Sequence, residues 1–269
     1  MTLGSFILIK NEAPWIGPHL ASWLPHLDEM VFFDGNSTDG TLEIIREFQE
    51  RHEDGKKIKL FLDKDPADLQ DAYVKMFDEC MRSLSTDMAF FLHPDQILAD
   101  PWRLGNIPED CVAASCDMDS FAGDPGGQLL KIKTGRADKW MNIYRLRNPD
   151  LGAHYWGHYG AANEAVYFNA ITGNQHDHYG HNFGNYPYPV FDTGCKILHF
   201  SDVRTYERRY GRMVSALMNQ GLSPAAAEIM ARAHPRVILQ DYPPFTFEKA
   251  DYPQIFKTWK EGLRPAIAA

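Results

Sequence analysis

Four short apolar segments in the first hundred residues constrain the fold more than any other feature. They are residues 5–9, 30–33, 58–62 and 88–92, which read SFILI, MVFF, IKLFL and MAFFL. Runs of this kind are typical of strands that are buried on both faces of a parallel sheet. Amphipathic stretches predicted to be helices, 41–50 and 68–84, lie between them. The alternation of strand and helix predicts a parallel α/β half with right-handed crossovers.

Polar side chains directly follow each apolar segment. They are Lys10, Asn11 and Glu12 after the first segment, Asp34 after the second, Asp63 and Asp65 after the third, and His93 and Asp95 after the fourth. Because open parallel sheets bind ligands at the carboxyl ends of their strands, we expect these side chains to converge at one edge. Clustered carboxylates repel one another unless a cation or a ligand rich in hydrogen-bond donors lies between them. The sequence therefore predicts a divalent metal at this edge.

The segment DGNSTDG at residues 34–40 admits several explanations. A calcium loop of the EF-hand type needs Gly at the sixth position and Glu at the twelfth, where this chain has Asp39 and Ile45. The glycine-rich phosphate-binding patterns are also missing. What remains is a nucleotide-sugar pocket in which Asp34 accepts hydrogen bonds from a base or ribose, or a simple capped turn. We prefer the turn for residues 36–40, with Thr38 or Asp39 as the N-cap of the next helix, and a ligand role for Asp34.

The first hundred residues resemble the GT-A glycosyltransferases, and family 2 of these enzymes in particular. The resemblance rests on the strand end I-x-N-E in ILIKNEAPW and on the pattern D-E-x-V-x-x-D-x-x-S-T-D-G-T in DEMVFFDGNSTDGT. It implies a GT-A fold, with a Rossmann-like nucleotide-binding half, a mixed central sheet and carboxy-terminal helices. It also implies that Glu12 and Asp34 contact the donor nucleotide, and Asp63 is a weaker match.

The same resemblance implies a metal site after the fourth strand. The family has Asp-x-Asp there, whereas this chain has His93, Pro94 and Asp95. Asp95 is thus implied as a ligand of Mn²⁺ or Mg²⁺ on the donor diphosphate, and His93 either joins it or hydrogen-bonds to ribose or a backbone carbonyl. His199, after the apolar segment KILHF, is implied as a second ligand, with structural packing as the alternative.

The second half contains further strand-like segments, 111–116, 129–133, 141–147, 164–168 and 196–200, which predict mixed, partly antiparallel strands. Glu164 begins one of them, and the resemblance makes it the candidate general base of an inverting transfer. The alternatives are a cross-strand ion pair with Arg145 or Arg147, and retaining chemistry.

A helix is predicted over 202–218, after a cap formed by Ser201 and Asp202. Steps of four place Arg204, Arg208 and Arg212 on one stripe of this helix. The stripe is suited to binding diphosphate oxygens, and we assign Arg208 to the donor; the alternative is a solvated face.

We expect one domain over residues 1–269, with a nucleotide-sugar half at 1–105, an acceptor-side half at 106–201 and a helical segment at 202–269. A net charge of −9 disfavours a nucleic acid polymer as partner. No apolar stretch approaches the roughly 20 residues of a membrane span, so we expect a cytoplasmic protein. The predicted function is metal-assisted transfer of a sugar from a UDP- or GDP-sugar to a saccharide or other hydroxyl acceptor. The alternatives are a non-catalytic nucleotide-sugar-binding protein and another metal-dependent nucleotide enzyme, such as a nucleotidyltransferase.

Overall fold

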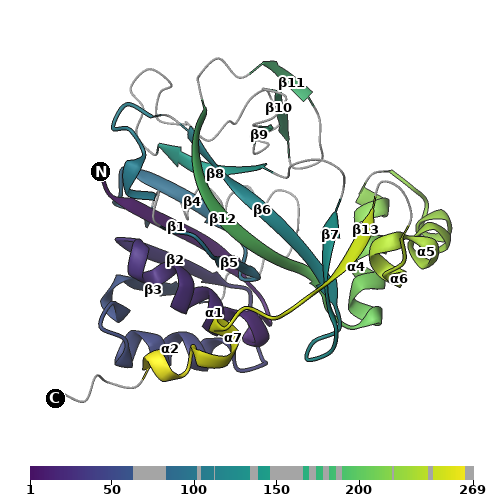
Figure 1. Ribbon diagram of the computed structural model, residues 1–269, viewed down its shortest axis with the longest axis horizontal. Coiled ribbons are helices and arrows are strands. Elements are labelled where there is room, and N and C mark those ends of the chain that lie inside the picture. The colour runs from purple at the N-terminus through teal and green to yellow at the C-terminus, as the bar shows by residue number, and fades with distance from the viewer. Residues whose placement is uncertain are drawn as a thin grey trace.

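The computed structural model describes most of the chain, and Figure 1 shows how its elements are arranged. The described residues are 1–62, 83–101, 104–111, 113–133, 139–145, 166–169, 174–177, 182–185, 190–219, 221–241 and 245–263. The helix predicted over 68–84 falls almost wholly outside them.

The amino-terminal half contains the four predicted strands. They are β1 (Leu3–Ile9), β2 (Glu29–Asp34), β3 (Ile58–Phe61) and β4 (Met88–Leu92). They lie in the order β4-β1-β2-β3, and every pair among them is parallel. All six residues of β2 are buried, as is typical of a strand inside a parallel sheet. The predicted parallel α/β half is thus confirmed for the described residues.

Two helices pack together beside these strands: α1 (Ala13–Trp23) and α2 (Thr41–Arg51). The α1 side chains Ile16, Leu20 and Trp23 are fully buried in the core. Helix α2 matches the predicted helix 41–50, but its predicted N-cap is wrong. The residue at the cap is Gly40, whose φ of +92° lies in the left-handed region that glycine adopts without strain.

The remaining strands turn this parallel sheet into a mixed one, as predicted. They are β5 (Gln96–Leu98), β6 (Ala113–Gly123), β7 (Leu129–Lys133), β8 (Lys139–Arg145), β12 (Val190–Val203) and β13 (Thr246–Ala250). Among the described residues, ten strands form one sheet whose main order is β13-β7-β6-β8-β4-β1-β2-β3. Strand β12 pairs parallel with β6 and antiparallel with β5. A second sheet joins β9 (Val166–Asn169), β10 (Asn174–Asp177) and β11 (Asn182–Asn185).

The carboxy-terminal helices are α4 (Tyr206–Asn219), α5 (Pro224–Ala233), α6 (Pro235–Ile238) and α7 (Ile255–Thr258). Short 3₁₀ turns complete the chain: η1 (Leu24–His26), η2 (Gly55–Lys57), η3 (Leu104–Asn106) and η4 (Glu261–Leu263). Helices α4, α5 and α6 form a group beside β7 and β13, whereas α7 returns to α1 and α2 (Figure 1). The ring of Trp259, just after α7, stacks on Phe48 of α2.

Helix α4 begins four residues later than predicted, because β12 continues through Val203. Ser201 and Asp202 are strand residues, so the prediction that they cap the helix is wrong. Arg204 lies before the helix and does not share a helical stripe with Arg208 and Arg212. Arg236 forms an ion pair with Asp202. The carboxylate of Asp202 is therefore satisfied within the strand and does not cap the helix. Among the described residues, no helix is long and apolar enough to cross a bilayer.

Candidate functional site

Three carboxylates follow the carboxyl ends of adjacent parallel strands. Register places Ile9 of β1 beside Asp34 of β2, and Ile7 of β1 beside Leu92 of β4. Glu12 and Asp95 each follow their strand by three residues. The sheet therefore brings Glu12, Asp34 and Asp95 to one edge, the edge where open α/β sheets bind ligands.

Asp34 is buried, and one of its two carboxylate oxygens has no hydrogen-bond partner in the described structure. Its Oδ2 accepts a hydrogen bond from the backbone N–H of Ser37 at 3.0 Å, while Oδ1 is left over. The side chain of Asn11 fixes the same turn, because its Oδ1 accepts from the N–H of Thr38 at 2.8 Å. A buried acceptor without a donor is costly unless a ligand satisfies it.

Asp39 contrasts with Asp34, because hydrogen bonds satisfy both of its carboxylate oxygens. Oδ1 accepts from the N–H of Thr41, the first residue of α2, and Oδ2 accepts from the N–H of Ala13, the first residue of α1, each at 3.1 Å. Burial alone would raise the pKa of Asp39, but a hydrogen bond from the Thr41 hydroxyl, together with these two N–H groups, outweighs burial and lowers the pKa. Asp39 thus joins the amino termini of two helices, as the capped-turn interpretation of residues 36–40 requires.

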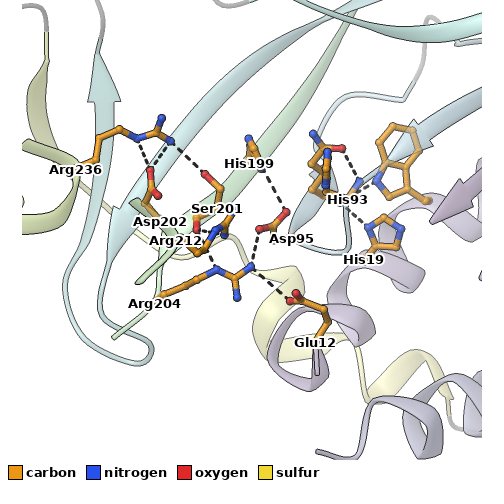
Figure 2. A network of polar contacts seen from close by, with 12 residues as sticks. Glu12, His19, His93, Asp95, His199, Ser201, Asp202, Arg204, Arg212 and Arg236 are labelled. Atoms are coloured by element: carbon orange, nitrogen blue, oxygen red, sulfur yellow. Dashed lines mark hydrogen bonds and ion pairs between the residues drawn. The ribbon is translucent and has the colours of Figure 1, made fainter. Parts of the chain in front are cut away.

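Asp95 is a buried carboxylate held between two basic groups (Figure 2). Its Oδ2 lies 3.0 Å from Nη2 of Arg204, and its Oδ1 lies 3.4 Å from Nε2 of His199. The pairing of β5 with β12 brings them together, since it places His199 opposite Gln96. Burial alone would raise the pKa of Asp95, but His199, His93 and Arg204 hold it well below its usual range. The rings of His93 and His199 stack with centroids 6.1 Å apart.

Glu12 approaches the same guanidinium from the start of α1 (Figure 2). Its Oε2 lies 3.6 Å from Nη2 of Arg204 and makes no hydrogen bond within the described part of the chain. Burial raises the pKa of Glu12 to about 7; Asp95 adds to this shift and Arg204 opposes it. Glu12 therefore exchanges its proton near neutral pH.

Arg204 is the functional candidate whose place the sequence did not predict. Its guanidinium is buried, and Nε donates to the carbonyl of Ser201 at 3.0 Å. Arg212 donates to that same carbonyl at 2.8 Å. Arg208, which the sequence assigned to the donor, is exposed on α4 and stays a prediction. The sequence analysis missed Arg204 because it ended the strand too early. With the true end of β12 at Val203, Arg204 directly follows a strand, much as Glu12 and Asp95 follow β1 and β4.

For the other predicted site residues the structure shows few or no contacts that test their roles. Asp63 and Glu164 lie outside the described residues, so their roles stay predictions. Lys10 is exposed at the end of β1, and His93 donates its backbone N–H to Oε1 of Gln96 at 2.9 Å. Among the described side chains, no group of three or more His, Cys, Asp and Glu is arranged to hold a metal ion.

The fold and the edge of carboxylates define an α/β protein with a Rossmann-like half and a mixed sheet, as predicted. Residues 6–102 match the model of the family described as Glycosyl transferase family 2. The predicted resemblance to family 2 of the glycosyltransferases is therefore confirmed for residues 6–102. The match contains Glu12, Asp34 and Asp95 and ends before His199 and Arg204.

Three solved structures show limited similarity to this chain. S. aureus TarS, residues 1–349, is 13% identical with a TM-score of 0.41, over 88% of this chain and 71% of that one. The mannosyltransferase PcManGT from Pyrobaculum calidifontis, in complex with GDP-Man and Mn²⁺, is 14% identical with a TM-score of 0.43, over 86% and 73% of the two chains. Glucosyl-3-phosphoglycerate synthase from Mycobacterium tuberculosis, with Mn²⁺ and UDP-Glc, is 17% identical with a TM-score of 0.32, over 44% and 43%. No curated protein sequence matches this chain.

Proposed function

We propose that this protein transfers a sugar from a nucleoside-diphosphate donor, a UDP- or GDP-sugar, to a hydroxyl acceptor with the help of a divalent cation. One observation carries the proposal. Glu12, Asp34 and Asp95 lie within the residues that match glycosyl transferase family 2, and each has a buried carboxylate oxygen without a hydrogen-bond partner in the described structure. A ligand rich in donor groups, together with a cation, is what such oxygens require.

Asp34 is proposed to bind the nucleotide. Its Oδ2 is fixed by the N–H of Ser37, so Oδ1 is oriented and available to accept from a base N–H or a ribose hydroxyl. Glu12, Lys10, Asn11, Asp63, His93 and Arg208 are the other proposed donor-binding residues. Asn11 would act by shaping the turn beside Asp34.

Asp95 and His199 are proposed to hold Mn²⁺ or Mg²⁺. Their donor set of one carboxylate and one imidazole fits Mn²⁺ well, and the two ligand atoms already face each other, since Oδ1 of Asp95 lies 3.4 Å from Nε2 of His199. Two protein ligands leave coordination positions for diphosphate oxygens and water. When bound, the cation supplies positive charge beside the diphosphate as the sugar leaves. Among the described residues, Arg204 would add a guanidinium close to the same place.

Glu164 is proposed as the general base of an inverting reaction. In that role its carboxylate takes the proton of the acceptor hydroxyl as the oxygen attacks the anomeric carbon, while the diphosphate leaves from the opposite face. A positioned base typically contributes about 10²–10⁴-fold to the rate. The assignment rests on the sequence resemblance.

Thermal unfolding with UDP or GDP, each with and without Mn²⁺, tests the donor site. A ligand at one hundred times its Kd stabilises the folded state by about 2.7 kcal/mol. We expect this stabilisation in the wild type and its loss in Asp34→Asn. The matched control is Asp28→Asn, because Asp28 precedes β2 at the opposite edge and accepts from the N–H of Leu3. Equal stabilisation of Asp34→Asn and the wild type would contradict the proposed nucleotide contact.

Product analysis separates the candidate functions. A glycosyltransferase releases the nucleoside diphosphate, whereas a nucleotidyltransferase that uses a nucleoside triphosphate releases pyrophosphate. Glu164→Gln should abolish sugar transfer or donor hydrolysis while UDP or GDP still binds. A wild type that binds the donor and leaves it intact with every acceptor, and in water, would favour the binding-only alternative.

A further inference from the structure

Arg204 lies against Asp95, the proposed carboxylate ligand of the cation. Its Nη2 lies 3.0 Å from Asp95 and 3.6 Å from Glu12, and its side chain is about nine-tenths buried. The guanidinium is anchored from behind, because Nε donates to the carbonyl of Ser201. Figure 2 shows Arg204 between the two carboxylates, with His199 on the far side of Asp95. One carboxylate, Asp95, is thus shared between Arg204 and the proposed metal ligand His199.

When Glu12 is ionised, the described cluster is close to electrical balance before any ligand binds. Glu12 and Asp95 are carboxylates, and Arg204 and Arg212 are guanidiniums that meet at the carbonyl of Ser201. A divalent cation alone would place a large excess of positive charge beside a buried guanidinium, which is unfavourable where solvent screens little. A nucleoside-diphosphate sugar carries about two negative charges, so cation and donor together restore the balance.

A guanidinium can exchange one anionic partner for another. It binds phosphate oxygens in the bidentate geometry in which it binds carboxylates, and its delocalised charge is less strongly hydrated than that of an ammonium. A diphosphate next to Asp95 would therefore compete for Arg204 and release the carboxylate to the cation. Because Nε stays hydrogen-bonded to the carbonyl of Ser201, the exchange needs only a small tilt of the rigid, planar guanidinium as a whole.

We propose that Arg204 couples cation binding to donor binding: it neutralises Asp95 and Glu12 in the donor-free protein and transfers to the diphosphate when the donor arrives. This inference rests on the proposed function and adds the order in which the two ligands bind tightly. The cation binds weakly until the diphosphate has drawn Arg204 from Asp95. By linkage, each ligand raises the affinity for the other by the same factor. Arg204 is a positioning residue in this scheme.

Removal of the charge at Arg204 should change the two separate affinities in opposite directions. For Arg204→Met without nucleotide, we expect Mn²⁺, measured by the electron paramagnetic resonance signal of the free ion, to bind at least fivefold more tightly than in the wild type. Without metal, the variant should bind UDP or GDP at least fivefold more weakly by calorimetry. A residue that only supports the fold would weaken both affinities. The inference is wrong if Mn²⁺ alone binds no more tightly to the variant.

Two further variants make the test robust. Arg232→Met removes an exposed guanidinium from α5 and should leave both affinities unchanged. Arg204→Lys keeps the positive charge, so Mn²⁺ alone should bind as weakly as to the wild type, while metal-free UDP or GDP binding should fall at least threefold because bidentate contact is lost. If Arg204→Met does not fold, unchanged metal-free nucleotide affinity in Arg204→Lys overturns the inference.

The same measurements separate this inference from the function on which it rests. If neither UDP nor GDP binds the wild type in the presence of Mn²⁺, the proposed function itself fails. If the wild type binds Mn²⁺ and nucleotide but Arg204→Met behaves like Arg232→Met, the proposed function stands and the coupling role is refuted.

Discussion

Replacement of Glu12 by Gln should change how the stability of the protein depends on pH. The pKa of this carboxyl rises from its ordinary 4.5 to about 7 on folding, chiefly because the group is buried. Between these values the folded state binds more protons than the unfolded state. The contribution of Glu12 to the free energy of unfolding is therefore largest at low pH and is lost as the pH rises through 7. From pH 5 to pH 8, linkage gives a loss of about 2.5 kcal/mol that Glu12→Gln does not suffer.

Urea unfolding at pH 5, 6, 7 and 8 measures this difference. The free energy of unfolding of Glu12→Gln, minus that of the wild type, should increase steadily over the series. Glu47→Gln is the matched control, because Glu47 is a partly exposed carboxylate on α2 that pairs with Arg51 at 2.9 Å; the change of the Glu12→Gln difference with pH should exceed that of Glu47→Gln by at least about 1 kcal/mol. A Glu12→Gln difference equally flat with pH would refute the burial argument and the electrostatic picture of the Arg204 cluster.

Three predictions concern the scaffold, each read from urea unfolding at pH 7. Asp39→Ala removes acceptors from the first N–H groups of α1 and α2 and should cost about 2 kcal/mol; a cost below 0.5 kcal/mol would contradict the double capping role. Arg209→Met removes the Nε donor from the carbonyl of Val237 and one of two donors from the carbonyl of Gly123, which keeps the N–H of Arg204. The change should cost about 2–4 kcal/mol, whereas a neutral result would show that water replaces the guanidinium. Gly55→Ala should cost about 1–3 kcal/mol, because the new Cβ would clash with the carbonyl oxygen of Phe48. Gly211→Ala, in open space on α4, should instead stabilise the protein by up to about 1 kcal/mol. Equal effects of the two substitutions would refute the steric argument.

The parallel half was predictable because its signal is local. A strand buried on both faces must be apolar at nearly every position; β4 satisfies this throughout, and β2 satisfies it at its four central residues, 30–33. The boundaries of α2 were predictable within a residue for a similar reason. Its cap was not, because Gly40 supplies a backbone conformation while the neighbouring Asp39 supplies the hydrogen bonds, and the sequence does not show this division.

The extent of β12 was not predictable from local pattern. Ser201 and Asp202 resemble a helix cap, and only partners far along the chain keep them in a strand: Arg212 donates to the carbonyl of Ser201, and Arg236 pairs with the carboxylate of Asp202. The consequence reaches the site. Because the strand is longer than predicted, Arg204 lies beside Asp95 and not on a stripe of α4. The arginine that contacts the proposed metal ligand Asp95 is therefore Arg204 and not the predicted Arg208.

The two aspartates of DGNSTDG show what distinguishes a structural carboxylate from one that awaits a ligand. Both lie in the same turn, yet the backbone accounts for both oxygens of Asp39, while Asp34 keeps one buried oxygen without a partner among the described residues. Spacing alone cannot separate these cases, because the donor to Asp39 from Ala13 comes from a different helix. Glu12 and Asp95 differ from Asp34, because the buried oxygen of each has a charged partner: Oε2 of Glu12 lies 3.6 Å from Arg204, and Oδ1 of Asp95 lies 3.4 Å from His199. A buried oxygen without a donor costs stability in a protein with no ligand, so Oδ1 of Asp34 is the atom that most directly supports a ligand with a hydrogen-bond donor at this edge of the sheet.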